Sequence, residues 1–234
     1  SRGLGDVYKR QGFMVFGMSE EDYLLKLALF SVAVFGFISL FGDMVYEGAR
    51  SIVPSYLELL MAPAFIVGFA IGLGEFLGYA LRLVFGVVAD TKKAYWSLTI
   101  LGYILIGVVP LLALVGRWEI AVVLVLVERL GKAVRSPARD TLLSLTTSKW
   151  GRGKAFGFHE LMDQVGAVSG PLIAMVSIYY ASTRYNALDQ IRFAFKILLI
   201  PYLALVAVLF YGFLKLKGPT GEILTSYERM REEE

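Results

Sequence analysis

Charged residues interrupt several long apolar stretches of this chain, and their spacing indicates the chemistry they could carry. Asp43, Glu47 and Arg50 follow one another at i, i+4 and i+7, so they share one face of a helix. Two acids and one base on a face can form an ion pair and leave a spare carboxylate. Such a carboxylate can take up and release a proton, as proton-coupled transport requires. The alternative is that Glu47 and Arg50 only solvate the end of the helix.

Glu75 lies near the middle of another apolar stretch and has no charged neighbour within a helical turn. A carboxylate at such a depth needs a partner from another helix or becomes protonated. Arg50 and Arg129 are the predicted partners, and a neutral, hydrogen-bonded glutamate is the alternative. Asp163 is a further candidate for proton coupling. His159 lies one turn before it, and a lone histidine near the start of a helix is more often structural than functional.

The residues that are rare or missing exclude several classes of protein. The sequence contains no cysteine and one histidine, so neither a thiolate site nor a zinc site of the usual kind is expected. No catalytic motif and no cofactor are predicted. A membrane-embedded hydrolase would need a nucleophile beside His159, and the sequence suggests none. The net charge of +3 comes without a basic block, so nucleic acid is not an expected partner.

Composition indicates the elements that must position these charges. The chain is 57% hydrophobic and 18% charged, which is more apolar than soluble domains require. We therefore predict an all-α, polytopic membrane protein with six transmembrane helices, each long enough to cross a bilayer. The expected spans are 24–57, 64–88, 95–115, 119–137 or beyond, 155–180 and 191–216.

The fourth span leaves two interpretations open. Arg129, Lys132, Arg135 and Arg139 recur at three- and four-residue steps, which places them on one side of a helix. Either the helix leaves the membrane near Arg129 and lies in water, or its charged stripe faces a polar cavity inside the bundle.

Two patterns concern the whole bundle. Lys and Arg concentrate in alternate loops, so both ends of the natural chain are expected on the cytoplasmic side. A weak repeat relates Glu75-Phe-Leu-Gly78 to Asp163-Gln-Val-Gly166, as two inverted three-helix units would produce. Glycines four residues apart, such as Gly68 and Gly72, are expected to serve helix packing.

These motifs bring the chain to a known family, because it resembles the N-terminal half of a major facilitator superfamily transporter over about 24–217. The loop residues Gly86 and Asp90 match in spacing the family's Gly-x-x-x-Asp-Arg-x-Gly-Arg-Arg signature, although Thr91 replaces the arginine. The resemblance implies that this loop locks one conformation against the other half. It also implies that Arg129 faces a cavity. The stretch 128–140, with 155–163 after it, is similar to a poorly characterised prokaryotic subgroup.

A second motif of the family lies in the fifth span. Gly166, Gly170 and Pro171 resemble the Gly-x-x-x-Gly-Pro motif of drug/proton antiporters, but Ala174 and Met175 stand where a Gly-Gly pair would follow. The resemblance implies a secondary transporter working by alternating access, a proton-coupled exporter of a small molecule in a prokaryotic plasma membrane. A small organic-anion symporter or uniporter, or a self-pairing six-helix protein, remains an alternative.

The ends of the chain carry separate expectations. Residues 1–11 resemble a translated sequencing-library adaptor, with a natural polar tail as the alternative, and Met14 and Met18 are plausible starts. Residues 12–23 are expected to form a cytoplasmic segment, 24–216 the six-helix unit, and 217–234 a cytoplasmic linker. We expect the chain to be truncated there, so a C-terminal six-helix half is the predicted partner, along with the lipid bilayer, protons and the substrate.

Overall fold

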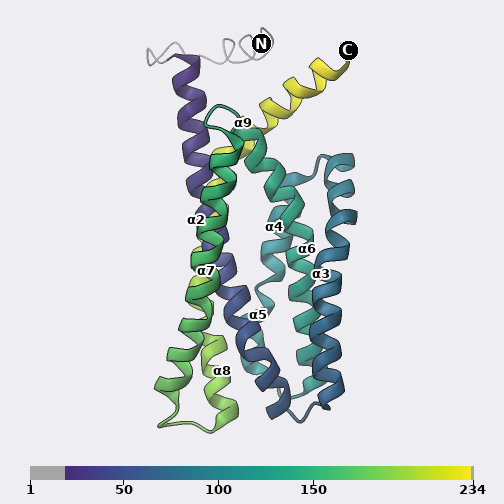
Figure 1. Ribbon diagram of the computed structural model, residues 1–234, viewed down its shortest axis with the longest axis vertical. Helices are drawn as coiled ribbons and strands as arrows, with labels where there is room; N and C mark the ends of the chain where they lie inside the picture. Colours follow the sequence, from purple (N-terminus) through teal and green to yellow (C-terminus); the bar gives the residue numbers. More distant parts are fainter. Residues whose placement is uncertain (1–18, 233–234) are drawn as a thin grey trace.

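The computed structural model of the chain describes residues 19–232, and all of its regular elements there are helices (Figure 1). The adaptor-like stretch 1–11 and both suggested starts lie outside the described residues. In chain order the elements are α2 (Glu20–Leu59), α3 (Ala64–Lys92), α4 (Tyr95–Leu105), α5 (Val108–Leu111), the short 3₁₀ helix η2 (Leu112–Leu114), α6 (Trp118–Thr146), α7 (Arg152–Ala181), α8 (Ala187–Ile197) and α9 (Leu199–Glu232).

Five segments are long and apolar enough to cross a membrane: 21–59, 64–92, 95–114, 152–181 and 187–226. The predicted fourth span, α6, carries too many charges to count among them. It nevertheless runs inside the bundle, packed against α3 and α4 (Figure 1). Large apolar side chains such as Phe65 and Leu83, 76% and 77% exposed, cover the outside, as a lipid-facing surface requires. The all-helical membrane bundle is confirmed.

Two predicted spans are broken near a proline. The third divides at Ile106 and Gly107, and the sixth at Leu198, where α8 ends and α9 begins. Each break lies three to four residues before Pro110 or Pro201. A proline has no N–H to donate, and its ring clashes with the carbonyl four residues earlier, so the helix changes direction there.

The ends of the first and last helices also differ from the predicted spans. Helix α2 begins at Glu20, inside the segment 12–23 that was expected to precede it, and its N-cap Ser19 accepts a hydrogen bond from the backbone N–H of Asp22. Helix α9 continues through Glu232, so the residues expected to form a linker after 216 are helical over their described length.

Helix packing follows the repeat that the sequence suggested. Among the main contacts, α2 packs against α7 and α9, while α6 packs against α3 and α4. The first three spans can be matched in order to the last three, so that α2 corresponds to α6, α3 to α7 and α4 to α9. The α2–α7 contact then corresponds to the α6–α3 contact, and the α2–α9 contact corresponds to the α6–α4 contact. The bundle is thus made of two three-helix units, and the first and fourth spans occupy equivalent places at its centre.

Both described ends lie at the same end of the bundle, as an even number of crossings requires. The start of α2 and the end of α9 are there, together with the α3–α4 and α6–α7 connections (Figure 1). The α2–α3, η2–α6 and α7–α8 connections lie at the opposite end.

Candidate functional site

The charged stripe of α6 faces the inside of the bundle. Arg129 and Arg135 are 2% and 1% exposed, and Glu128 and Arg139 are also buried. The interpretation in which the helix leaves the membrane near Arg129 and lies in water is therefore wrong. Buried guanidinium groups need acids or aromatic faces around them, and the neighbouring helices supply both.

The two central helices, α2 and α6, meet along a row of polar pairs that we call the α2–α6 seam. Arg139 Nη1 donates to Ser39 Oγ at 2.8 Å, Arg135 Nη2 lies 3.3 Å from Asp43 Oδ1, and Lys132 Nζ lies 3.8 Å from Glu47 Oε1. Residue numbers rise along α2 as they fall along α6, so the helices are antiparallel in a single register. Steps of three or four residues keep every pair on the facing sides.

Helix α3 joins the seam through Glu75. Glu75 Oε1 lies 3.3 Å from Arg50 Nη2 and 3.2 Å from Arg129 Nη1. These are the two cations that the sequence suggested as its partners. Arg50 also contacts Glu47, at 3.3 Å. The predicted residues Glu47, Arg50, Glu75 and Arg129 thus form one ion-pair network.

Two tyrosine rings contact the cations of the seam. Arg129 donates a hydrogen bond to the Tyr46 hydroxyl, and the Lys132 ammonium lies 3.8 Å from the centre of the same ring. The Arg135 guanidinium carbon lies 4.6 Å from the centre of the Tyr103 ring. Aromatic faces attract desolvated cations, so these rings help to hold three basic residues close together. Sequence reasoning missed both tyrosines, since tyrosines are common in apolar helices.

His159 has a serine partner, contrary to what the sequence suggested. Its Nε2 lies 2.6 Å from Ser39 Oγ, a residue 120 positions earlier, and its Nδ1 lies 3.8 Å from Asp163 Oδ2. The Ser39 hydroxyl also accepts from Arg139, and both Ser39 and His159 are buried, at 0% and 3% exposure. Neither Ser39 nor His159 lines the cavity beside these helices. Ser39, Arg139 and His159 therefore tie α2, α6 and α7 together, and the arrangement does not favour a hydrolase.

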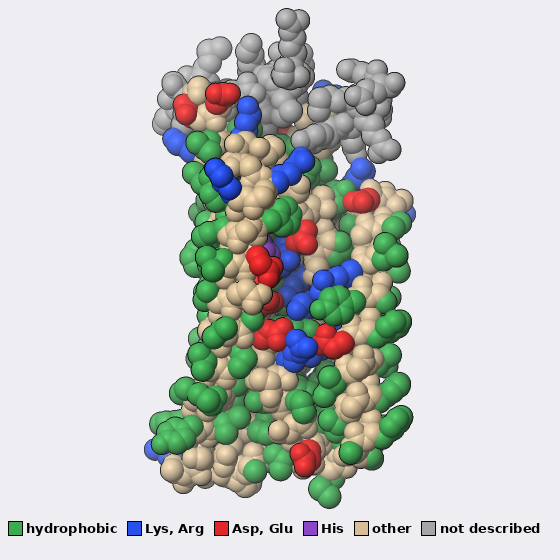
Figure 2. Space-filling view, in the orientation of Figure 1, with side chains coloured by type: hydrophobic (Ala, Val, Ile, Leu, Met, Phe, Trp, Pro, Cys, Tyr) green, Lys and Arg blue, Asp and Glu red, His purple; other side chains and the backbone are tan. Residues whose placement is uncertain are grey.

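A cavity of about 490 Å³ opens beside the seam. Figure 2 shows charges of both signs gathered in this hollow, between two columns of largely apolar surface. Its charged lining residues come from four helices, and they are Asp43, Glu47, Arg82, Lys132, Arg135, Arg139, Asp140, Glu160 and Asp163. This cavity is the candidate site, because a polar hollow inside an apolar bundle is where a solute could be held away from lipid.

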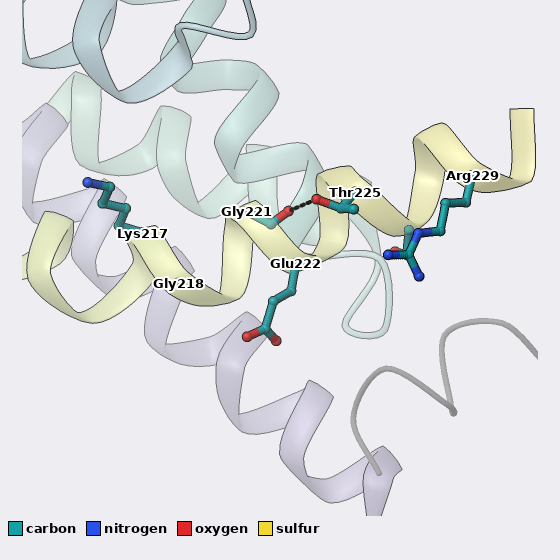
Figure 3. A pocket seen from close by; sticks show the side chains of 7 residues that line it. Lys217, Gly218, Gly221, Glu222, Thr225 and Arg229 are labelled. Carbon is teal, nitrogen blue, oxygen red and sulfur yellow. Dashed lines mark hydrogen bonds between the residues drawn. The ribbon is translucent and has the colours of Figure 1, made fainter. Parts of the chain in front are cut away.

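A second hollow lies along α9, and its described lining includes Lys217, Glu222 and Arg229 (Figure 3). In this wall Thr225 Oγ1 donates to the Gly221 carbonyl at 3.0 Å. All of the described lining belongs to one helix, so among residues 19–232 no opposing wall encloses a solute. The central cavity is the better candidate.

The predicted packing glycines fall into two groups. A Cβ on Gly166 would lie 2.5 Å from the Leu40 carbonyl oxygen, and one on Gly170 would lie 2.4 Å from that of Met44. Both glycines therefore let α7 approach the backbone of α2, and Pro171 lines an apolar groove beside them. Around Gly68 and Gly72 no described atom beyond the backbone of their own helix turn and their chain neighbours lies within 4 Å of an added Cβ, so packing within this bundle does not explain them.

The loop motif lies apart from the charged network. Asp90, near the end of α3, accepts a hydrogen bond from the Tyr95 hydroxyl at 3.1 Å. A Cβ on Gly86 would make an ordinary contact with Pro137, at 3.6 Å. The structure therefore ties Asp90 to the neighbouring helix, and its expected role as a conformational lock stays a prediction.

Five of the six predicted charged residues meet in or beside the seam, and Asp163 lines the cavity from α7. The residues that sequence reasoning left out of the site include Ser39, Arg82, Lys132, Arg135, Arg139, Asp140 and Glu160. The basic stripe was visible in the sequence, but its partners depend on the register between α2 and α6, which no local pattern gives.

Comparison with known proteins places this geometry in context. An uncharacterised protein of Mycobacterium tuberculosis is 51% identical over 142 residues, which is 60% of this chain and 35% of that protein. An uncharacterised MFS-type transporter of Methanocaldococcus jannaschii is 29% identical over 157 residues, 67% of this chain and 39% of that protein. The matched segments thus span little more than a third of the curated relatives. No match was found among solved structures.

The family model described as Major Facilitator Superfamily matches residues 32–231, nearly all of the described bundle. That range includes both three-helix units, the α2–α6 seam and every charged residue that lines the cavity. The chain therefore belongs to the major facilitator superfamily.

Proposed function

We propose that this chain is the N-terminal half of a proton-coupled transporter that exports a small molecule by alternating access. In this mechanism two six-helix halves rock about a central site. The supporting observation is a polar cavity bordered by buried ion pairs. It lies at the centre of a bundle whose outer surface is apolar. A C-terminal half would complete the cavity from the open side.

Proton coupling would act through the ion pairs themselves. A proton bound by Asp43 would neutralise it, which would free the Arg135 guanidinium 3.3 Å away for a substrate. Loss of the proton would restore the pair and expel the substrate group. Glu75 stands in the same relation to Arg50 and Arg129, so it would be a second coupling carboxylate. Asp163 would contribute from the opposite wall.

The expected location is a prokaryotic plasma membrane with both ends in the cytoplasm. The connections α3–α4 and α6–α7 and the helix ends beside them carry Lys92, Lys93, Lys149, Arg152 and Lys154, and they lie at one end of the bundle. Basic loops remain on the cytoplasmic side. The export direction rests on the resemblance of Gly166, Gly170 and Pro171 to the antiporter motif.

The coupling proposal is tested by Asp43→Asn in a transporter that has both six-helix halves, in liposomes that carry an imposed pH gradient. A pH-sensitive dye is enclosed in the liposomes. When a transported solute is added, the dye should report proton movement with the unmodified protein and no proton movement with the variant. Glu58→Gln, which changes an exposed acid near the end of α2, is the matched control and should behave as the unmodified protein. If the Asp43→Asn protein is inserted in the membrane and its gradient-dependent transport is unchanged, the coupling role of Asp43 is refuted.

The two alternatives make different predictions. An organic-anion symporter or uniporter would suit the basic stripe of α6, and inward uptake that collapses without a proton gradient would favour it. A self-pairing six-helix protein would build its cavity from two copies. Sequencing the gene downstream of the codon for Glu234 separates self-pairing from a two-half transporter, since an in-frame second set of six spans indicates two halves and a stop codon supports self-pairing. The direction of solute movement separates the anion carrier from the exporter.

A further inference from the structure

The walls of the central cavity carry opposite charges. Helices α2 and α7 contribute the acids Asp43, Glu47, Glu160 and Asp163, while α3 and α6 contribute the bases Arg82, Lys132, Arg135 and Arg139. The one acid on the basic wall, Asp140, is paired with Arg139 at 2.9 Å. The cavity is therefore polarised across its width and nearly neutral as a whole.

Each wall also has buried polar atoms that lack a partner. Within residues 19–232, Nε and Nη1 of Arg135 have no hydrogen-bond acceptor, although this side chain is only 1% exposed. On the acidic wall, Oδ1 of Asp163 has no donor. Buried polar groups are almost always hydrogen-bonded, so unpaired donors on one wall and an unpaired acceptor on the other indicate groups that a ligand satisfies.

We propose that the cavity binds a small zwitterionic solute, with its acid group at Arg135 and Arg82 and its ammonium group at Asp163 and Glu160. This assignment rests on the proposed function, because it names the substrate class of the same site. A simple anion would meet Arg135 but face four acids across the cavity, and a simple cation would face four bases. A solute that carries both charges satisfies both walls, and a cavity of about 490 Å³ admits a small one.

The test uses amino acids whose two charges lie at increasing separation. Glycine, 4-aminobutyrate and 6-aminohexanoate are titrated into the full chain in lipid nanodiscs by calorimetry. Butyrate and butylammonium serve as probes that keep one charge each. We expect at least one zwitterion to bind ten-fold or more tightly than both single-charge probes.

Variants assign the two ends of the solute. Arg135→Gln should reduce binding of the preferred zwitterion to the level of butylammonium, and Asp163→Asn should reduce it to the level of butyrate. Arg117→Gln, at the exposed start of α6 and outside the cavity, should leave binding unchanged. Because Arg135→Gln removes a buried charge, Arg135→Lys is measured beside it. It keeps the charge but lacks the forked donors, so it should weaken the zwitterion and butyrate alike.

Several results would overturn the assignment. Butyrate that binds as tightly as the best zwitterion would identify an anion site, equal binding of butylammonium would identify a cation site, and no binding by any probe would reject the site. Exchange of labelled zwitterion across liposomes that contain both six-helix halves separates this outcome from the transport proposal. Arg135-dependent binding without exchange would refute transport alone, whereas Asp43-dependent proton movement with no zwitterion binding would refute the substrate class alone.

Discussion

Helix α2 meets α7 on one side and α6 on the other, and the two contacts are built from different residues. Towards α7 the closest approach is made at glycines, and an added Cβ on Gly170 would lie 2.4 Å from a backbone oxygen of α2. Towards α6 it is made by long charged side chains, with atoms of opposite charge 3.3 to 3.8 Å apart. A contact between backbones has one geometry, whereas long side chains can exchange partners. The difference indicates that α2 and α7 form a rigid pair, and that change in this bundle occurs along the α2–α6 seam.

The largest expected effect is on the rigid contact. Gly170→Val would place side-chain atoms within 3 Å of the Met44 carbonyl and the Gly48 nitrogen, and neither backbone atom can move away alone. Overpacking typically costs about 1–3 kcal/mol, and a clash with backbone costs more. We expect little or no monodisperse protein by size-exclusion chromatography. Gly72→Val, at a position where nothing lies within 4 Å, should elute as the unmodified protein does. Equal yields from the two variants would contradict a rigid α2–α7 pair.

A smaller effect is expected from breaking the most deeply buried pair of the seam. Arg135→Gln leaves Asp43, 8% exposed, without its cation, and removing one partner of a buried pair costs about 3–5 kcal/mol. Adding Asp43→Asn removes the stranded charge, so the double variant should recover much of that loss. Thermal unfolding of the single and double variants in detergent measures this coupling. Simple additivity of the two losses would show that the residues are not energetically paired.

The smallest effect is expected at the open end of the seam. Lys132 and Glu47 are 21% and 20% exposed, and their charged atoms are 3.8 Å apart. Partly solvated pairs contribute about 0–1 kcal/mol, and Glu47 keeps Arg50 as a partner. Lys132→Met should therefore shift unfolding much less than Arg135→Gln, under the same conditions. A loss as large as that of Arg135→Gln would show that burial does not rank the pairs of the seam.

The sequence predicted well those features that depend on local spacing. The six-helix bundle, the shared face of Asp43, Glu47 and Arg50, and the two partners of Glu75 all follow from length, hydropathy and the cost of an isolated charge. The breaks at Gly107 and Leu198 also had a local signal, because a proline follows each within four residues.

Features that depend on the register between distant helices could not be predicted. The hydropathy of α6 did not decide between water and a cavity, since both environments accept a charged stripe. Two contacts depend on how far α2 is shifted along its neighbours. The pairing of Arg135 with Asp43 depends on its position along α6, and the contact of Ser39 with His159 depends on its position along α7. At Gly68 and Gly72 the sequence predicted helix packing that this bundle does not show, because a spacing that permits close packing does not by itself supply a neighbouring helix.

The constant register of the α2–α6 seam has a mechanical consequence. The polar pairs of the seam recur about once per helical turn, or about every 5 Å. The two helices can therefore form similar sets of pairs at positions one turn apart. A slide of one turn would bring Asp43 opposite Lys132 and Glu47 opposite Arg129, with every acid again facing a base. A smaller slide would leave each charge between two partners. We expect motion along this seam to occur in whole steps, and cysteines placed at Ser39 and Ser136 would cross-link only after one such step.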